Sequence, residues 1–502
     1  MSKQVRVRFA PSPTGPLHIG GVRTALFNYL FAKKHGGVFY LRIEDTDQNR
    51  YVEGAEEYII EALNWCGIPF DEGVGKEGKF GPYRQSERKD IYKQYALNLI
   101  ENGWAYYAFD TPEALDTLRA TAEAEGKTFI YNHTNREKLD TSLVISAEET
   151  QKRLNDGEHY VIRFKTPVDE TLYLKDIIRG DIKFETNLLD DKVLFKSDGM
   201  PTYHLANIVD DHLMETSHVI RGEEWLPSLP LHELLYRAFG WEAPQFAHLP
   251  LILKPVGNGK LSKRDGDKLG FPVFPLEWKN PDGTISSGYR EKGFLPEAVI
   301  NFLALLGWNP GTDQELFTLD ELVQLFDLER VHKAGAKFDP EKNKWFNHQY
   351  FGREDNEVLA QQLQHTLLEK GINRPIEMVT EVVGLVKERA SFASELWDLT
   401  DFFFVAPTSY DEKAAKNWKP ETAEVMTKLI DVLENIADFS SANVESLVKA
   451  WMEQNEIGMG KVMQPLRLSL VGAVKGPHLF DIIALIGKAE TISRIQKAIA
   501  TL

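Results

Sequence analysis

Residues 5–43 limit the possible folds of this chain more than any other segment. Val5–Ala10 alternates apolar and basic residues as a short strand does, and Pro11–Gly15 predicts a turn. Apolar residues at helical spacing follow over residues 20–34, and residues 38–43 return to a strand pattern. Strand, helix and strand in such a short stretch form the unit from which parallel sheets are built. The chain therefore begins with a parallel α/β sheet.

The remainder of the sequence predicts an insertion into this sheet and a helical end. From about Thr111 the alternation gives way to a polar helical stretch and then to VIRFK, TLYLKD and DIKFE, which have antiparallel-strand patterns. Strands and helices alternate again from near Val193. After about Phe271, long amphipathic patterns run to Leu502 with almost no strand signal. The expected domains are the first half of an α/β domain (1–110), an α+β insertion (111–194), the second half (195–270), a helical domain (271–335) and an all-helical domain (336–502).

Composition narrows the class of protein further. The 502 residues carry 58 Lys and Arg against 75 Asp and Glu, a net charge of −17, which at first argues against a polyanionic partner. The one cysteine, Cys66, excludes an intrachain disulfide and any multi-cysteine metal site. No apolar run is long enough to cross a membrane or resembles a signal peptide. We therefore expect a cytoplasmic protein with no membrane contact.

The first motif that carries chemistry is PSPTGPLHIGG, residues 11–21. It lies between a strand end and a helix start, where a parallel sheet binds ligands and where a helix offers N–H groups to phosphate. Gly20 and Gly21 would let a purine or a phosphate approach the backbone, and His18 would donate to phosphate oxygens. A glycine-containing turn with an ordinary histidine is the alternative interpretation.

The second motif is KLSKR, residues 260–264, in a loop that Gly257 and Gly259 open. Its three cations could close on a polyphosphate and neutralise the charge that develops in phosphoryl or adenylyl transfer. A basic loop that is merely solvated is the alternative interpretation.

Together the two motifs, in this order around a split sheet, resemble the signature sequences of class I aminoacyl-tRNA synthetases. The segments VRVRFAPSPTGPLHIGG, FYLRIEDTD, PTYHLANIVDDH, HVIRGEEW and KLSKRDGDK are similar to those of the bacterial glutamyl-tRNA synthetases, and the resemblance covers essentially the whole chain. It implies a Rossmann-type catalytic domain, an insertion that binds the acceptor end of tRNA, a helical domain that contacts the stem and an all-α anticodon-binding domain. The implied reaction forms glutamyl-adenylate from L-glutamate and ATP with release of pyrophosphate, and then acylates the terminal adenosine of tRNA(Glu).

The resemblance also assigns roles to residues. It implies that His18, Lys263 and, as a second candidate, Lys260 are catalytic, and that His18, Gly20, Gly21 and Lys263 bind ATP. The implied glutamate pocket consists of Arg8, Ala10, Ser12, Glu44, Tyr203, Asn207 and Arg221. An arginine guanidinium can bind a carboxylate through two parallel N–H···O hydrogen bonds. The family pattern favours Arg8 for the side-chain carboxylate of glutamate and Glu44 for its amino group.

The expected metal is magnesium that arrives with ATP. Glu44, Asp45 and Asp47 leave a carboxylate cation site open as an alternative. Some bacterial relatives bind zinc through cysteines at the positions of Ala108 and Asp110 and through further ligands near residues 131–134. Here His133 is the only plausible remnant, and zinc takes about four ligands, so no zinc is expected.

Several alternatives concern the partners and the loops. The enzyme could also charge tRNA(Gln), or the chain could be a tRNA-binding paralogue without catalysis; a monomer is expected. The loop at 273–289 looks longer than in most relatives, and the sequence gives it no function. Despite the net charge, residues 1–50 carry eight Lys and Arg against three Asp and Glu, and residues 458–502 carry six against two. These local basic segments are compatible with an RNA partner. The basic candidates for anticodon contacts are Lys461, Arg467, Lys475, Arg494 and Lys497.

Overall fold

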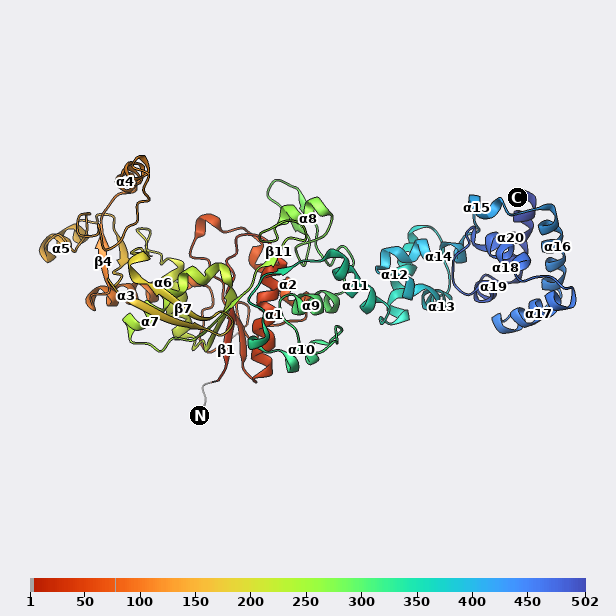
Figure 1. Ribbon diagram of the computed structural model, residues 1–502, viewed down its shortest axis with the longest axis horizontal. Coiled ribbons are helices and arrows are strands. Elements are labelled where there is room, and N and C mark those ends of the chain that lie inside the picture. Colours follow the sequence, from red (N-terminus) through yellow and green to blue (C-terminus); the bar gives the residue numbers. More distant parts are fainter. Residues whose placement is uncertain (1–3, 77) are drawn as a thin grey trace. The chain divides into compact units, whose positions relative to one another are not determined.

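A computed structural model describes residues 4–76 and 78–502 of the chain (Figure 1). It forms two compact units. The first contains the residues up to Lys292 together with Val299–Pro340, and the second contains Gly293–Ala298 together with Glu341–Leu502. In the described residues, no helix has both the length and the apolar character that a membrane crossing requires.

The N-terminal segment folds as the predicted parallel unit. β1 (Arg6–Phe9) is fully buried and pairs with β2 (Val38–Leu41) in parallel register from Arg6↔Val38 to Phe9↔Leu41, and α1 (Ile19–Lys34) connects them. β3 (Glu72–Gly73) continues this sheet beside β2, after α2 (Ala55–Trp65). The prediction of a parallel α/β sheet at this end of the chain is confirmed.

The second half of the sheet comes from later in the sequence. β9 (His218–Gly222) and β10 (Gln245–Leu249) pair in parallel, with α6 (Tyr203–Leu213) before β9 and α7 (Leu229–Phe239) between the two strands. The backbone N–H of Ser217 donates to the carbonyl of Arg6 at 2.9 Å, which brings β9 alongside β1. The two halves therefore meet, as a split sheet requires.

The insertion contributes antiparallel strands in two places. β4 (Ala105–Ala108), β5 (Val161–Phe164) and β8 (Val193–Phe195) form one antiparallel sheet, accompanied by α4 (Pro112–Ala124) and α5 (Ala147–Asn155). The expected domain boundary near residue 110 leaves β4 in the first half of the catalytic domain, but its pairing with β5 places it in this sheet. Strand composition does not reveal which partner a strand will find.

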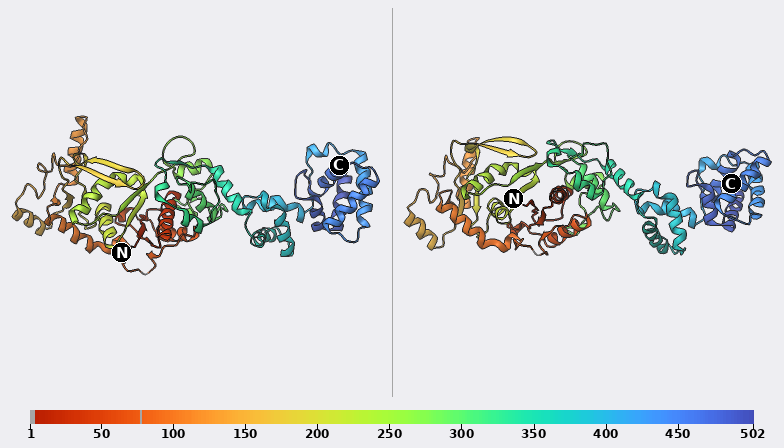
Figure 2. Two further views of the ribbon diagram at one scale, coloured as in Figure 1. Left: turned by 60° about the horizontal axis from the view of Figure 1, so that its bottom comes forward. Right: turned by 90° about the horizontal axis from the view of Figure 1, so that it is seen from below.

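The other antiparallel pair is a hairpin of β6 (Thr171–Asp176) and β7 (Gly180–Glu185), drawn in yellow in Figure 2. The hairpin does not stay within the insertion. Asp176, the last residue of β6, pairs in parallel with Phe246 of β10, so the sheet order is β7-β6-β10-β9.

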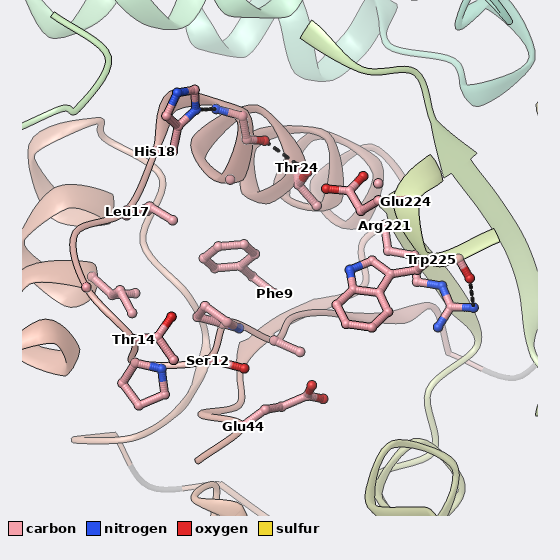
Figure 3. Close-up of a pocket in the computed structure, with 18 of the residues that line it drawn as sticks. Phe9, Ser12, Thr14, Leu17, His18, Thr24, Glu44, Arg221, Glu224 and Trp225 are labelled. Carbon is pink, nitrogen blue, oxygen red and sulfur yellow. Dashed lines mark hydrogen bonds between the residues drawn. The ribbon is translucent and has the colours of Figure 1, made fainter. Parts of the chain in front are cut away.

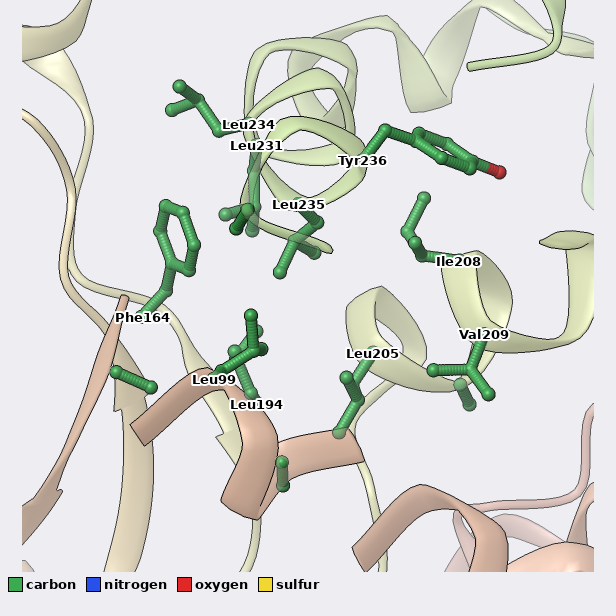
Figure 4. Packing of buried hydrophobic residues seen from close by; sticks show 14 of the residues in the cluster. Leu99, Phe164, Leu194, Leu205, Ile208, Val209, Leu231, Leu234, Leu235 and Tyr236 are labelled. Atoms are coloured by element: carbon green, nitrogen blue, oxygen red, sulfur yellow. The ribbon is translucent and has the colours of Figure 1, made fainter. Parts of the chain in front are cut away.

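One apolar core joins the insertion to the parallel sheet. Figure 4 shows Leu99 of α3 (Lys89–Glu101), Phe164 of β5, Leu205 of α6 and Leu235 of α7 converging. All four side chains are at most 1% exposed. Because these residues share one core, the insertion packs as part of the first unit.

Three short strands interrupt the segment that was expected to be helical from residue 271 to 335 and just beyond it. β12 (Trp278–Lys279) and β13 (Ile285–Ser286) form an antiparallel hairpin inside the long loop at 273–289. β14 (Ala336–Lys337) pairs in parallel with β11 (Ile252–Leu253). The other elements of this part are α8 (Lys263–Leu269), α9 (Pro296–Leu305) and α10 (Leu319–Leu325).

The second unit is helical, as predicted, and Figures 1 and 2 show only helices in its cyan-to-blue part. It has one apolar core around α12, α13 and α14 and another around α16, α17, α18 and α20. The helices from the start of this unit to the end of the chain are α11 (Pro340–Phe351), α12 (Asn356–Glu369), α13 (Ile376–Val386), α14 (Leu396–Phe404), α15 (Glu412–Ala415), α16 (Pro420–Glu434), α17 (Ser441–Gln454), α18 (Gly460–Val471), α19 (Leu479–Ile486) and α20 (Lys488–Thr501).

Candidate active site

A cavity of about 790 Å³ lies in the first unit, beyond the carboxyl ends of β1, β2 and β9 (Figure 3). The carboxyl ends of parallel strands meet at one edge of a sheet, so residues that follow different strands gather there. All of the residues predicted for ATP and glutamate contribute to its lining: Arg8, Ala10, Ser12, His18, Gly20, Gly21, Glu44, Tyr203, Asn207, Arg221, Lys260 and Lys263.

A network of buried charges includes Arg8 and Glu44, which line this cavity. Arg8 donates to both carboxylate oxygens of Asp211, from Nε at 3.0 Å and from Nη2 at 3.2 Å. Arg42 donates to Asp211 Oδ1 at 2.8 Å and to Glu44 Oε1 at 2.9 Å. Burial alone would raise the pKa of Asp211, but the charges of Arg8 and Arg42 outweigh burial and hold that pKa below its usual range. Asp211 is therefore ionised and forms ion pairs with both guanidinium groups.

Sequence reasoning missed Asp211 and Arg42. The signal was present in the paired aspartates of PTYHLANIVDDH, because carboxylates on an otherwise apolar helix need partners when they are buried. Asn207 and Asp211 are four residues apart on α6 and so lie on one face of that helix. Both belong to this network, in which Asn207 Nδ2 donates to Glu44 Oε1 at 3.1 Å.

The two pocket arginines have different numbers of donors left. A guanidinium has five N–H groups. In the described structure Arg8 uses two, both on Asp211, and so keeps three. Arg221 donates from Nε to His248, from Nη1 to Tyr203 and His232, and from Nη2 to the carbonyl of Trp225, and so keeps one. Arg8 can therefore grip a carboxylate with two bonds, and Arg221 can add a single one.

Glu44 and Asn207, which both line the cavity, each keep an acceptor oxygen without a donor among the described residues. Glu44 Oε1 accepts from Arg42 and Asn207, whereas no described residue donates to Glu44 Oε2. Asn207 Oδ1 is buried and has no hydrogen-bond partner in the described part of the chain. The backbone N–H of Glu44 donates to the carbonyl of Pro11 at 3.0 Å, which fixes the turn that contains Ala10 and Ser12. A ligand amino group would satisfy both acceptors.

His18 caps the start of α1 at the upper edge of Figure 3. Its Nδ1 accepts from the backbone N–H of Gly20 at 3.1 Å. Burial, followed by the charge of Lys260, lowers the pKa of His18 to about 4. The imidazole is therefore neutral at pH 7, and its proton is on Nε2. That atom is buried and has no partner among the described residues, so it is a donor held ready for a ligand.

We expected free backbone N–H groups at the start of α1, but the first three of them already have acceptors. Ile19 donates to the carbonyl of Val273, Gly20 to His18 Nδ1, and Gly21 to the carbonyl of His18. These three N–H groups are therefore engaged, whereas the helix dipole still favours an anion at this helix start.

Gly20 and Gly21 differ in what a side chain at each position would contact. A Cβ on Gly20 would meet only His18 Nδ1, at 3.5 Å. A Cβ on Gly21 would lie 2.5 Å from Leu17 Cδ1, so Gly21 serves the packing of the preceding turn. Only Gly20 fits the predicted role of leaving room for a ligand.

The lysines of the KLSKR loop have different partners. Lys260 is exposed and forms an ion pair with Glu224 Oε1 at 2.7 Å. Lys263, the first residue of α8, is half-buried, and its Nζ donates to the neutral amide of Asn280 at 3.3 Å. No described carboxylate forms an ion pair with Lys263, whereas Glu224 is paired with Lys260.

Asn280 is a lining residue that sequence reasoning missed. It lies in the β12–β13 hairpin, where its Nδ2 donates to the carbonyl and the hydroxyl of Thr284 and to the hydroxyl of Ser286. These bonds turn Oδ1 toward Lys263. Trp278 of the hairpin packs edge-on against Tyr58 of α2, with ring centroids 5.3 Å apart. The long loop at 273–289 is therefore one wall of the cavity, and only its length gave a signal in the sequence.

The three carboxylates after β2 do not face a common point. Asp45 accepts the backbone N–H of Ser86 at 2.8 Å, Asp47 pairs with Arg50, and Glu44 belongs to the arginine network. Among residues 4–76 and 78–502, no group of three metal-ligating side chains is found. The alternative of a carboxylate cation site has no support from this geometry.

Comparisons with known proteins agree with the fold and the cavity. Residues 4–345 match the family described as tRNA synthetases class I (E and Q), catalytic domain, and residues 358–499 match an anticodon binding domain. The chain is 78% identical over 502 residues to the glutamate–tRNA ligase of Flavobacterium johnsoniae and 76% identical to that of Flavobacterium psychrophilum, with the whole of each chain covered. A crystal structure of a glutamate tRNA ligase from Elizabethkingia meningosepticum in complex with its amino acid is 55% identical, with a TM-score of 0.96 over the whole of both chains.

The split parallel sheet and the two motifs around its cavity are those of a class I aminoacyl-tRNA synthetase of the glutamate and glutamine group. Within that class, the identity over the full length places the chain in the glutamate–tRNA ligase family.

The site predicts that the imidazole of His18 stays neutral from about pH 6 to pH 8 with its proton on Nε2, because its pKa is lowered to about 4. Nitrogen NMR of histidine-labelled protein measures both properties, and a His18→Asn variant identifies the signal. The unfolded chain binds this proton near pH 6.5, so the contribution of His18 to stability is complete above that pH and is lost as the pH falls toward 4. A titration midpoint above pH 6 would contradict this assignment.

Proposed function

We propose that this chain joins L-glutamate to tRNA(Glu) in two steps. A carboxylate oxygen of glutamate attacks the α-phosphorus of ATP and pyrophosphate leaves. A hydroxyl of the terminal adenosine of the tRNA then attacks the acyl carbon and AMP leaves. Neither step needs a covalent nucleophile of the protein, so positioning and charge stabilisation supply the catalysis. The observation that carries the proposal is Arg8, a buried arginine with three N–H groups open to a cavity that also holds His18 and Lys263.

Each group in the cavity has a part in this reaction. The fork of Arg8 binds the side-chain carboxylate of glutamate, which an amide would match badly. Glu44 Oε2 and Asn207 Oδ1 accept from the α-amino group. His18 Nε2–H and Lys263 Nζ bind the phosphates, and Lys260 has a smaller share because of Glu224. Gly20 leaves room for ATP, whereas Ala10, Ser12, Tyr203 and Arg221 shape and complete the glutamate pocket.

The expected metal is magnesium bound to ATP, and no zinc is expected. Magnesium enters with the ATP phosphates, since Asp45 and Asp47 are engaged by the protein. We expect no zinc, because His133 is the only remnant of the ligand set and, at one position where some relatives carry a ligand, Asp110 accepts from the hydroxyl of Tyr131 at 2.7 Å. The protein acts as a monomer in the cytoplasm.

Glutamate-dependent exchange of pyrophosphate into ATP, measured with and without tRNA, tests the proposed function. We expect exchange that requires glutamate, and acylation of purified tRNA(Glu); the same assay with tRNA(Gln) shows whether the enzyme also charges that tRNA. Metal analysis of the same preparation is expected to find no stoichiometric zinc. A chain that binds tRNA(Glu) but supports no exchange would be the non-catalytic paralogue.

Lys263 is expected to contribute more to adenylate formation than Lys260 does. We predict that Lys263→Ala slows single-turnover adenylate formation by roughly tenfold or more, because an unpaired charge near the phosphates is lost. Lys260→Ala is the matched control and should slow the step less, since Glu224 already offsets that charge. Equal rates for wild type and Lys263→Ala would remove the proposed role.

Arg8 is expected to set glutamate affinity through its fork. Arg8→Lys keeps a positive charge beside Asp211 but loses the second parallel bond, so the KM for glutamate should rise by roughly tenfold or more while the KM for ATP changes little. Pyrophosphate exchange at varied glutamate and ATP measures both constants. An unchanged glutamate KM would show that another residue holds the side-chain carboxylate.

A further inference from the structure

Arg221 is held without a carboxylate partner. No described Asp or Glu forms an ion pair with its guanidinium, whereas Arg8 is paired with Asp211. Two imidazoles take that place: Nε donates to His248 Nε2 at 3.0 Å, and Nη1 donates to His232 Nδ1 at 3.3 Å. Neutral acceptors can fix the plane of a guanidinium without offsetting its charge, which then remains available to a substrate carboxylate.

The bonds determine the tautomer of His248. Arginine can only donate, so His248 Nε2 must be the unprotonated nitrogen and Nδ1 must carry the hydrogen. Nδ1 lies 2.6 Å from Asp176 Oδ2, and both side chains are fully buried. Burial, opposed by the bond with Asp176 and reinforced by the charge of Arg221, lowers the pKa of His248, so the imidazole is neutral at pH 7. Asp176 therefore selects the tautomer that can accept from Arg221.

Asp176 is itself fixed by the β6–β7 hairpin. Its Oδ1 accepts the backbone N–H groups of Ile178 and Arg179 at 2.9 and 2.8 Å, and its Oδ2 accepts the backbone N–H of His248 at 3.1 Å. Arg179 Nε donates in turn to the carbonyl of His248 at 3.1 Å. The hairpin thus holds both the backbone and the ring of His248, at the residue where β6 joins β10.

We propose that Asp176 and His248 are positioning residues that orient Arg221 toward the carboxylate of the amino-acid substrate. The hairpin of the insertion thereby sets the geometry of the glutamate pocket, although Asp176 does not line the cavity. This inference rests on the proposed function, since it concerns the affinity for glutamate.

Asp176→Asn tests the tautomer. The side-chain oxygen of Asn can still accept the backbone N–H groups of the turn. Its NH2 group, however, would face His248 Nδ1 and favour the tautomer with the hydrogen on Nε2. That hydrogen would point at the N–H of Arg221, and the bond between the two side chains would be lost. We expect the KM for glutamate in pyrophosphate exchange to rise by roughly tenfold or more, with little change in the KM for ATP. Nitrogen NMR should show His248 protonated on Nδ1 in the wild type and not in the variant. Asp181→Asn, which removes an exposed charge from the same hairpin, is the matched control and should change neither quantity.

A pair of substitutions at His248 separates positioning from packing. His248→Gln can place an amide oxygen toward Arg221 and an NH2 toward Asp176, and should keep much of the glutamate affinity. His248→Leu fills space without an acceptor and should lose that affinity, while thermal unfolding shows whether each variant is folded. Equal glutamate KM values for these two variants, or an Asp176→Asn variant with wild-type KM and tautomer, would overturn the inference. Absence of exchange in the wild type with tRNA(Glu) present would instead refute the proposed function.

Discussion

The site depends on the burial of two arginines, Arg8 and Arg42, against the carboxyl groups of Asp211 and Glu44. Arg8 lies on β1 and Arg42 directly follows β2, both in the first half of the sheet, and Asp211 lies on α6 of the second half. Removing one partner of a buried ion pair costs about 3–5 kcal/mol, because the other charge is left without compensation. The same interaction therefore closes the split sheet and fixes the donors that face the ligand. An apolar cluster could be as stable, but it would offer no fork to a carboxylate.

The two pocket arginines show how one chemical group can be prepared for two tasks. Arg8 is tied through one edge to an ionised carboxylate and keeps three N–H groups for a bidentate grip. Arg221 donates hydrogen bonds to two imidazoles, a tyrosine hydroxyl and a carbonyl. It keeps one N–H group, and no described carboxylate offsets its charge. The first arrangement favours geometric selection of a carboxylate over an amide, and the second favours electrostatic attraction. The two arginines differ because their hydrogen-bond partners differ.

His18 and Lys263, the residues proposed to bind phosphate, also have donors that the protein holds in place. Burial keeps His18 neutral, and the bond from Gly20 leaves its hydrogen on Nε2, which has no partner among the described residues. Lys263 contacts an amide and Lys260 a carboxylate, so two similar lysines differ in the charge they can offer. A reaction without a covalent protein nucleophile depends on such preorganised groups, since they need little rearrangement when charge develops.

The sequence by itself determined the main helices and strands and the residues of the two motifs, but it did not reveal Asp211, Arg42 or Asn280. Local periodicity was sufficient for the strand, helix and strand of residues 5–43 and for the helical C-terminal unit, and the motif residues gathered in one cavity because strand ends of a parallel sheet meet. The tertiary structure alone decided the partners: Asp211 for Arg8, Asp176 for His248, Asn280 for Lys263, and β5 for β4. These contacts join residues far apart in the chain, and no local pattern encodes which distant group will satisfy a buried charge. The protonation of His18 and His248 was decided there too, because it depends on burial and on the donors that surround each ring.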